Sequence, residues 1–123
     1  MRLLTSIPDE SLWRGDIIRL ARNYDLGPQS APVDLMVFDP NEDGRGLGVI
    51  VVSGYKSGAV LSVFPEESCG AGKRSLETAW LLRHWNDWFC YTYEQDASGN
   101  LVPLPIEGTQ ILAWDEREIV AKS

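Results

Sequence analysis

The chain is organised around one aromatic segment, which reads Trp80-Leu81-Leu82-Arg83-His84-Trp85-Asn86-Asp87-Trp88-Phe89-Cys90-Tyr91-Thr92-Tyr93. This segment contains six of the twelve aromatic residues of the chain and three of its five tryptophans. Large aromatic side chains dominate the energetics of protein cores and of protein–protein interfaces. The segment therefore marks either the centre of the core or a docking surface, and we expect its tryptophans mainly in the core.

The same segment predicts a helix that is followed directly by a strand. Six apolar residues fall on one half of a helical wheel, namely Ala79, Leu81, Leu82, Trp85, Trp88 and Phe89. Ser75 precedes this pattern and is a suitable N-cap, whereas Trp80 lies off the apolar half and is expected to be the most exposed tryptophan of the segment. Residues 89–93 alternate and are rich in strand formers, so we place the change from helix to strand between Asn86 and Phe89.

Five further segments have the composition of β-strands. They are residues 12–20, 33–38, 47–52, 59–64 and 109–114. The third and fourth predict a hairpin, and the third is apolar on both faces, which favours a central position. Residues 101–105 contain two prolines and are expected to be irregular or at a sheet edge. The sum predicts a single α+β domain over residues 1–123, with a mostly antiparallel, curved sheet or partial barrel of five to six strands and one helix packed on it.

The chain is acidic, with 18 acidic and 11 basic residues and a formal net charge of −7. Residues 85–123 alone hold seven acidic and two basic residues. This charge argues against nucleic acid as the ligand, because phosphate binding requires a basic surface. It suits a basic protein partner, although solubility alone also accounts for it. No apolar run approaches the roughly 20 residues of a membrane span, and the first ten residues do not resemble an export signal, so we expect a cytoplasmic protein without membrane contact.

No group of residues in the sequence predicts catalysis, a metal site or a cofactor. The single histidine, His84, lies on the predicted polar face of the helix, and no cluster of cysteine and histidine has metal-ligand spacing. Cys69 and Cys90 are expected to be reduced thiols, with Cys90 buried and Cys69 in a loop. Residues 70–75 match a phosphate-binding loop only in part, because Arg74 stands where such a loop needs serine or threonine. We therefore expect a simple connector there, and a protein that is not an enzyme.

Several landmarks together resemble a known family. Trp13-Arg14-Gly15-Asp16 opens the first predicted strand, and Gly46-Leu47-Gly48 begins the predicted hairpin. Trp80-Leu81-Leu82 then leads into Trp85-Asn86-Asp87-Trp88. This combination, over roughly residues 10–93, resembles the immunity protein 45 family of bacterial polymorphic toxin systems. The shared pattern consists of aromatic residues and glycines, and the family supplies no catalytic residues to carry over.

The resemblance implies a cytoplasmic immunity protein that binds a cognate toxin, or effector, domain and blocks its active site or substrate path. If the toxin is a nuclease, its active site is expected to be basic, and an acidic patch can cover it in place of phosphate. The expected partner-binding residues are acids in loops and near the C-terminus, together with one tryptophan. They are Asp39, Glu42, Asp43, Trp80, Asp115, Glu116 and Glu118. Each also has a simpler interpretation, as a solvated acid or, for Trp80, as a core residue.

Two other functions stay open at this point. A small β-barrel adaptor or structural accessory protein in a larger assembly is suggested by Gly15-Asp16-Ile17-Ile18, a pattern that small barrels often use. An enzyme that uses His84 with a carboxylate is the third hypothesis. We prefer the toxin-binding interpretation, because the chain is acidic and carries no recognisable set of catalytic groups.

Overall fold

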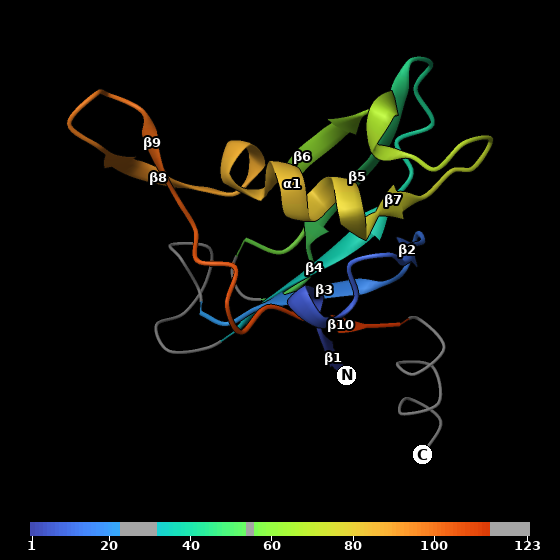
Figure 1. Ribbon diagram of the computed structural model, residues 1–123, viewed down its shortest axis with the longest axis horizontal. Helices are drawn as coiled ribbons and strands as arrows, with labels where there is room; N and C mark the ends of the chain where they lie inside the picture. The colour runs from blue at the N-terminus through green and yellow to red at the C-terminus, as the bar shows by residue number, and fades with distance from the viewer. Residues whose placement is uncertain (23–31, 54–55, 114–123) are drawn as a thin grey trace.

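The computed structural model describes residues 1–22, 32–53 and 56–113 (Figure 1). The first half holds β1 (Arg2–Leu3), η1 (Leu4–Ser6), β2 (Ser11–Leu12), β3 (Ile17–Leu20), β4 (Val33–Phe38) and β5 (Arg45–Val51). The second half holds β6 (Val60–Pro65), η2 (Glu66–Ser68), β7 (Leu76–Glu77), α1 (Thr78–Trp88), β8 (Cys90–Gln95), β9 (Leu101–Pro103) and β10 (Gln110–Leu112). Within these residues, no helix has the length and apolar character that crossing a membrane requires.

The main sheet has six strands in the order β1-β10-β3-β4-β5-β6, and every neighbouring pair is antiparallel. Two short pairs, β2–β7 and β8–β9, lie outside it. Helix α1 crosses one face of the sheet, and the β8–β9 pair projects from the end of the molecule opposite β2 (Figure 1). The prediction of an α+β fold with a curved antiparallel sheet and one packed helix is confirmed. The sheet is open rather than a closed barrel, because β1 and β6 form its two edges.

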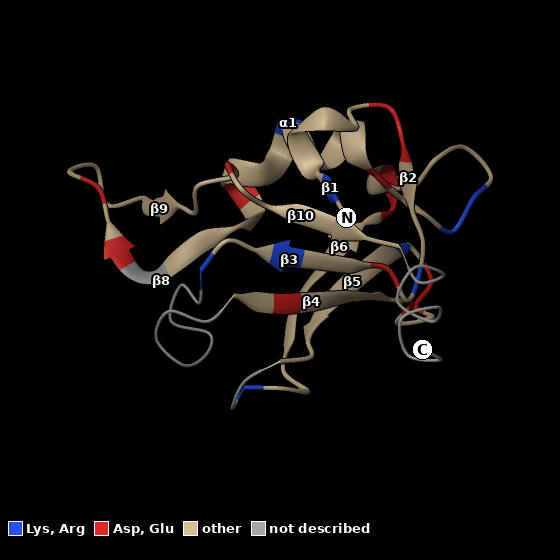
Figure 2. Ribbon diagram, turned by 90° about the horizontal axis from the view of Figure 1, so that it is seen from below, with Lys and Arg blue, Asp and Glu red and all other residues tan. Residues whose placement is uncertain are grey.

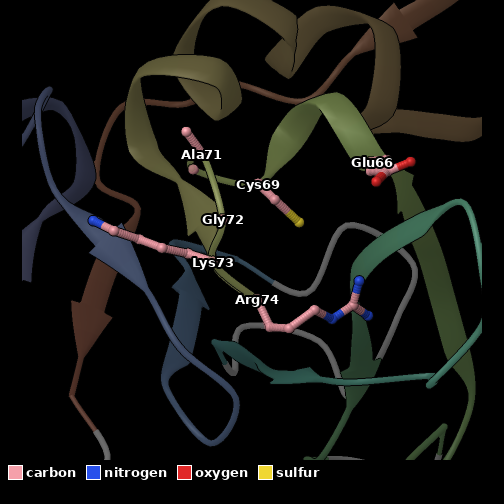
Figure 3. A pocket seen from close by; sticks show the side chains of 7 residues that line it. Glu66, Cys69, Ala71, Gly72, Lys73 and Arg74 are labelled. Atoms are coloured by element: carbon pink, nitrogen blue, oxygen red, sulfur yellow. The ribbon is translucent and has the colours of Figure 1, made fainter.

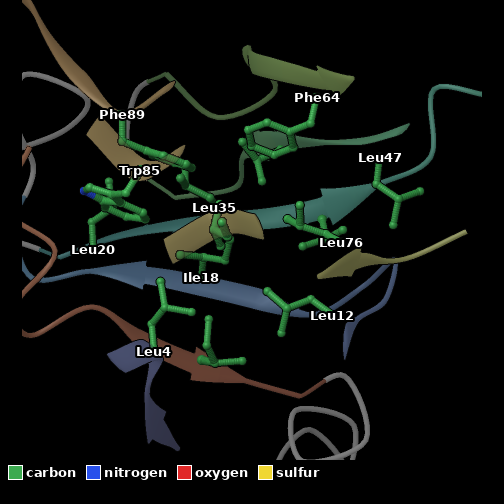
Figure 4. Close-up of a cluster of buried hydrophobic side chains, with 14 of the residues drawn as sticks. Leu4, Leu12, Ile18, Leu20, Leu35, Leu47, Phe64, Leu76, Trp85 and Phe89 are labelled. Carbon is green, nitrogen blue, oxygen red and sulfur yellow. The ribbon is translucent and has the colours of Figure 1, made fainter. Parts of the chain in front are cut away.

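Strand β4 illustrates how the sequence pattern creates the core. Val33, Leu35 and Val37 are buried, while the residues between them are only half-buried, as expected for a strand with one face against a helix. Leu35 lies opposite Ile18 of β3 on one side and Val51 of β5 on the other. These rows of branched side chains form the apolar face of the sheet on which α1 packs (Figure 4).

The aromatic side chains of α1 pack against this apolar face of the sheet. Trp85 stacks on Phe89 with ring centroids 4.0 Å apart, and its indole Nε1 donates a buried hydrogen bond of 2.8 Å to the carbonyl oxygen of Leu104. Phe64 of β6 meets Trp80 and Trp88 edge-on, at centroid distances of 5.7 and 5.3 Å. The aromatic segment is therefore the centre of the core, which was the preferred of the two interpretations.

The expected exposure of Trp80 is wrong, because only 4% of this residue is exposed. The helical wheel assumes that one flat layer contacts one half of the helix. Here Phe64 reaches Trp80 from the edge strand β6 and extends the buried arc beyond that half. The indole Nε1 of Trp80 is buried and has no hydrogen-bond partner among the described residues.

The helix begins two residues later than the predicted N-cap implies. Ser75 is fully buried and does not cap the helix, because its hydroxyl donates to Glu77 and accepts from the backbone amide of Gly70. Residues 76–77 instead pair with β2 as strand β7, and the helix starts at Thr78. The predicted change to a strand between Asn86 and Phe89 is confirmed, since α1 ends at Trp88.

The long strand predicted over residues 12–20 is divided in two. A turn at Trp13–Asp16 separates β2 from β3, so Arg14-Gly15-Asp16 lies in a turn and not in a strand. The strand predicted over 33–38 is confirmed, and so is the hairpin, formed by β5 and β6. Residues 101–103 form an edge strand outside the main sheet, as their prolines indicated, and the final predicted strand is present as β10.

Candidate functional site

Three adjoining cavities run along the end of the molecule that carries β2. The middle cavity, of 520 Å³, is lined by Trp13, Arg14, Asp39 and Arg74. It shares Trp13 with a cavity of 240 Å³ that reaches Leu12 and Ala113. It shares Arg74 with a third cavity, of 410 Å³, formed by Glu66 and residues 69–74. We call the four residues of the middle cavity the Trp13 surface, and the loops at this end carry both signs of charge (Figure 2).

The tryptophan of this surface is held outward by a tight turn. The Asp16 side chain accepts a hydrogen bond of 2.8 Å from the backbone amide of Trp13, and the Asp16 amide donates back to the Trp13 carbonyl at 3.0 Å. Gly15 has a φ of 94°, which favours glycine, and its amide donates to the carbonyl of Val37 on β4. Asp16 is buried, whereas Trp13 is 42% exposed. The turn therefore presents a large aromatic side chain to solvent on a fixed backbone.

A salt bridge between Arg74 and Asp39 forms another part of the lining of the middle cavity. The Nη2 atom of Arg74 lies 2.6 Å from Oδ1 of Asp39, and Nη1 donates to the carbonyl oxygen of Arg45 at 2.6 Å. The hydrogen bond from Arg74 holds the pKa of the Asp39 carboxyl below its ordinary value of 3.8, and a second one from the Asn41 amide lowers that pKa further. The same carboxylate raises the pKa of Arg74. Asp39 is therefore ionised and already neutralised by its partner.

Arg14 adds a second positive charge to this surface. Its side chain makes no hydrogen bond or ion pair with the described residues, although its charge lowers the Asp39 pKa at longer range. The described residues that line the middle cavity thus carry two guanidinium groups and one carboxylate. This described lining is cationic, in a chain whose net charge is −7.

The third cavity contains the glycine-rich connector that partly matches a phosphate loop. Adjacent residues Lys73 and Arg74 extend in opposite directions, and the Cys69 thiol lies between the connector and Glu66 (Figure 3). Arg74 is bound to Asp39, so the charged groups of Lys73 and Arg74 do not converge on one ligand position. The connector precedes β7 instead of the helix, which is a further departure from a phosphate-binding loop.

The predicted partner-binding residues lie in different parts of the structure. Asp39 lines the Trp13 surface but is paired with Arg74. Glu42 and Asp43 are exposed in the loop between β4 and β5 and have no ion pair with the described residues. Trp80 belongs to the core and lines none of the three cavities. The three C-terminal acids lie outside the described residues, namely Asp115, Glu116 and Glu118.

Sequence reasoning missed Trp13, Arg14 and Arg74 as members of a site. Asp16 offered a signal for the first two, because an aspartate three residues after Trp13, with a glycine between them, is typical of a side-chain-stabilised turn. Nothing local indicated that Arg74 faces Asp39, since the two are 35 residues apart in sequence.

His84 and Cys90 line none of the three cavities, whereas Cys69 lines the third. The His84 ring packs against Trp80 with the ring centroids 4.6 Å apart and the planes tilted by 30°, and its Nδ1 atom lies 3.6 Å from the exposed carboxylate of Asp87. Cys69 and Cys90 are both half-buried free thiols, so the expected full burial of Cys90 is wrong. Burial, and secondarily the charge of Asp87, raises the pKa of the Cys90 thiol. Among the described residues, no three His, Cys, Asp or Glu side chains gather to hold a metal ion.

Comparison with known proteins supplies the identity of the chain. No curated protein and no solved structure matches it. The family model described as Immunity protein 45 matches residues 4–99. That span contains the Trp13 turn, Asp39, Arg74 and the whole of α1, so it covers both the aromatic core and the candidate surface. The chain therefore belongs to the immunity protein 45 family.

Proposed function

We propose that this immunity protein binds the toxin domain of a cognate bacterial effector in the cytoplasm and neutralises it by covering a functional surface. The observation that carries the proposal is the family match over residues 4–99. An immunity protein protects by acting on a toxin, and direct binding is the simplest physical route for a small domain of this composition.

The Trp13 surface supports binding as the mode of action. Tryptophan and arginine are the residues most enriched among those that dominate the free energy of protein–protein binding. Because the Trp13 backbone is already fixed by Asp16 and Gly15, its association loses little additional conformational entropy. The adjoining cavities give a partner's side chains concave space on either side of the indole.

The charge of the chain favours a basic toxin, of which a nuclease is the foremost case. A net charge of −7 attracts a positively charged partner over long distances and raises the rate of encounter. Glu42 and Asp43 are exposed in the loop that follows Asp39 and are available to such a partner. Asp39 itself contributes less to this attraction, since Arg74 neutralises it.

The adaptor hypothesis has less support from the fold. It was suggested by a sequence pattern that small barrels often use, whereas the main sheet of the described residues is not closed into a barrel and ends in two edge strands, β1 and β6. No observation on the described residues favours it over toxin binding.

The proposal is tested by co-expressing this chain with the polypeptide encoded immediately upstream of its reading frame. We expect the two proteins to copurify and the chain to restore growth of cells in which the upstream polypeptide is toxic. Copurification without protection would separate binding from neutralisation. Failure of both binding and protection would refute the proposal.

A further inference from the structure

We infer that the Trp13 surface accepts a carboxylate of the toxin, seated between the free guanidinium of Arg14 and the indole of Trp13. This inference rests on the proposed function and adds the chemistry of the contact. The expected occupant is an aspartate or glutamate side chain of the toxin, with an apolar residue beside it.

The hydrogen-bonding state of Arg74 and Asp39 excludes them as the primary contacts. All three nitrogens of the Arg74 guanidinium already donate, to both carboxylate oxygens of Asp39 and to the carbonyl oxygens of Arg45 and Gly46. The two carboxylate oxygens of Asp39 accept from Arg74, and one of them also accepts from the amide of Asn41. An incoming cation would therefore meet a satisfied carboxylate and two positive charges.

Arg14 is the group in this cavity that remains unsatisfied. It is exposed and pairs with none of the described residues, so all of its donors are open to a partner. A guanidinium presents its donors in a planar fork that matches the two oxygens of a carboxylate. Because Asp39 is compensated by Arg74, the described residues that line the cavity carry an excess positive charge, which attracts an anion.

Trp13 supplies the apolar half of the contact. Its indole is 42% exposed and lines the same cavity as Arg14, which follows it directly in the turn. The methylene groups of an acidic side chain, or a neighbouring apolar residue, can pack against this ring while the carboxylate meets Arg14. The cavity volume of 520 Å³ is ample for such a pair of side chains.

A carboxylate contact is compatible with a toxin that is basic overall. Exposed acids occur on elements that adjoin this surface in the chain or in space: Glu42 and Asp43 follow Asp39 in the loop after β4, and Glu66 of η2 lines the neighbouring cavity that shares Arg74. These acids can attract a basic surface at long range, whereas the cationic contact at Arg14 fixes the orientation in which the partner docks. A partner with the opposite local pattern is rejected, because like charges then face each other.

The test compares Arg14→Glu with the matched control Arg83→Glu. Arg83 is exposed on α1, pairs with none of the described residues and lines none of the three cavities. The probe is the purified toxin domain of the upstream polypeptide, titrated calorimetrically against each full-length variant after circular dichroism has confirmed its fold. We expect Arg14→Glu to weaken binding at least about tenfold and Arg83→Glu to change it less than about threefold.

Arg14→Gln removes the positive charge without adding a negative one, and we expect its affinity for the toxin domain to lie between those of the wild type and Arg14→Glu. If Arg14→Glu does not fold, the affinity of Arg14→Gln tests the carboxylate contact. If the wild type binds the toxin domain and both Arg14 variants bind it equally well or more tightly, the carboxylate contact is refuted. The proposed function is unaffected by that result. A wild-type dimer that Arg14→Glu dissociates would overturn it in favour of a second copy of the chain. No binding by the wild type would refute the proposed function as well.

Discussion

Arg74 joins two loops that are distant in sequence. Its guanidinium bonds the Asp39 side chain and the carbonyl oxygen of Arg45, and thereby ties the connector before β7 to the β4–β5 loop. Arg74 is exposed and Asp39 is half-buried, and such partly solvated salt bridges contribute little to global stability. The main effect of the pair is therefore to hold the two loops in position. It keeps Asp39 occupied and fixes one wall of the Trp13 surface.

The Arg74–Asp39 pair predicts a specific pH dependence. The pKa of Asp39 is depressed in the folded protein, so the contribution of this carboxylate is present above its unfolded pKa and is lost as the pH falls through the lower folded value. We expect Arg74→Gln to lose less stability than the wild type as the pH falls from neutral to below 3.8, the ordinary pKa of this carboxyl, as measured by urea midpoints. Arg83→Gln serves as the charge-matched control. Equal pH dependence of the wild type and Arg74→Gln would contradict this account.

Gly48 is required by close packing and not by an unusual φ. A Cβ atom at this position would lie 2.5 Å from the carbonyl oxygen of Ser62 and 2.8 Å from the Phe38 ring. We expect Gly48→Ala to lower the free energy of unfolding by about 2–3 kcal/mol, because the backbone of β6 must move. Gly99→Ala, where the added atom meets nothing within 4 Å but φ is +84°, should cost only about 1 kcal/mol. Chemical denaturation of both variants tests this order, and a milder effect at Gly48 would refute it.

At the scale of elements, the aromatic residues of α1 pack against β6 and against the segment that follows β9. Trp85 contacts Phe89 and the Leu104 carbonyl toward β9, while Trp80 contacts Phe64 of β6. The two indoles are equally buried but differ in polarity. The Nε1 of Trp85 has a partner, and that of Trp80 has none among the described residues.

This difference predicts that phenylalanine is tolerated better at position 80 than at position 85. Trp85→Phe leaves the buried carbonyl of Leu104 without its indole donor, whereas Trp80→Phe removes an unsatisfied donor along with part of the ring. We expect Trp85→Phe to be less stable than Trp80→Phe by about 1–2 kcal/mol in urea unfolding followed by circular dichroism. The reverse order would show that the size of the cavity outweighs the hydrogen bond.

Elements with strong local signals could be predicted from the sequence. The alternation in Val33–Phe38 and the change of period at Phe89 placed β4 and the end of α1 correctly. The start of α1 could not be predicted, because Leu76 and Glu77 pair with β2, which is distant in sequence. The exposure of Trp80 depended in the same way on Phe64, a residue of another element.

At the scale of the whole molecule, the candidate surface is a product of tertiary structure. Its residues come from the turn after β2, the loop after β4 and the connector before β7. Acidic composition pointed to Asp39 and its neighbours but gave no indication that Arg14 and Arg74 surround that aspartate. The sequence therefore predicted a protein-binding domain and one residue of this surface, while the cationic character of the cavity required the fold.

The central claim is that this immunity protein acts by docking a toxin on the Trp13 surface. The most direct measurement is the affinity of the upstream toxin domain for Trp13→Ala and for Leu101→Ala, which truncates a similarly exposed apolar residue in β9, at the other end of the molecule (Figure 1). We expect Trp13→Ala to weaken binding by about 2 kcal/mol or more, roughly thirtyfold, and Leu101→Ala to leave it within about threefold of the wild type. Wild-type affinity in Trp13→Ala, with loss of binding in Leu101→Ala, would contradict the claim.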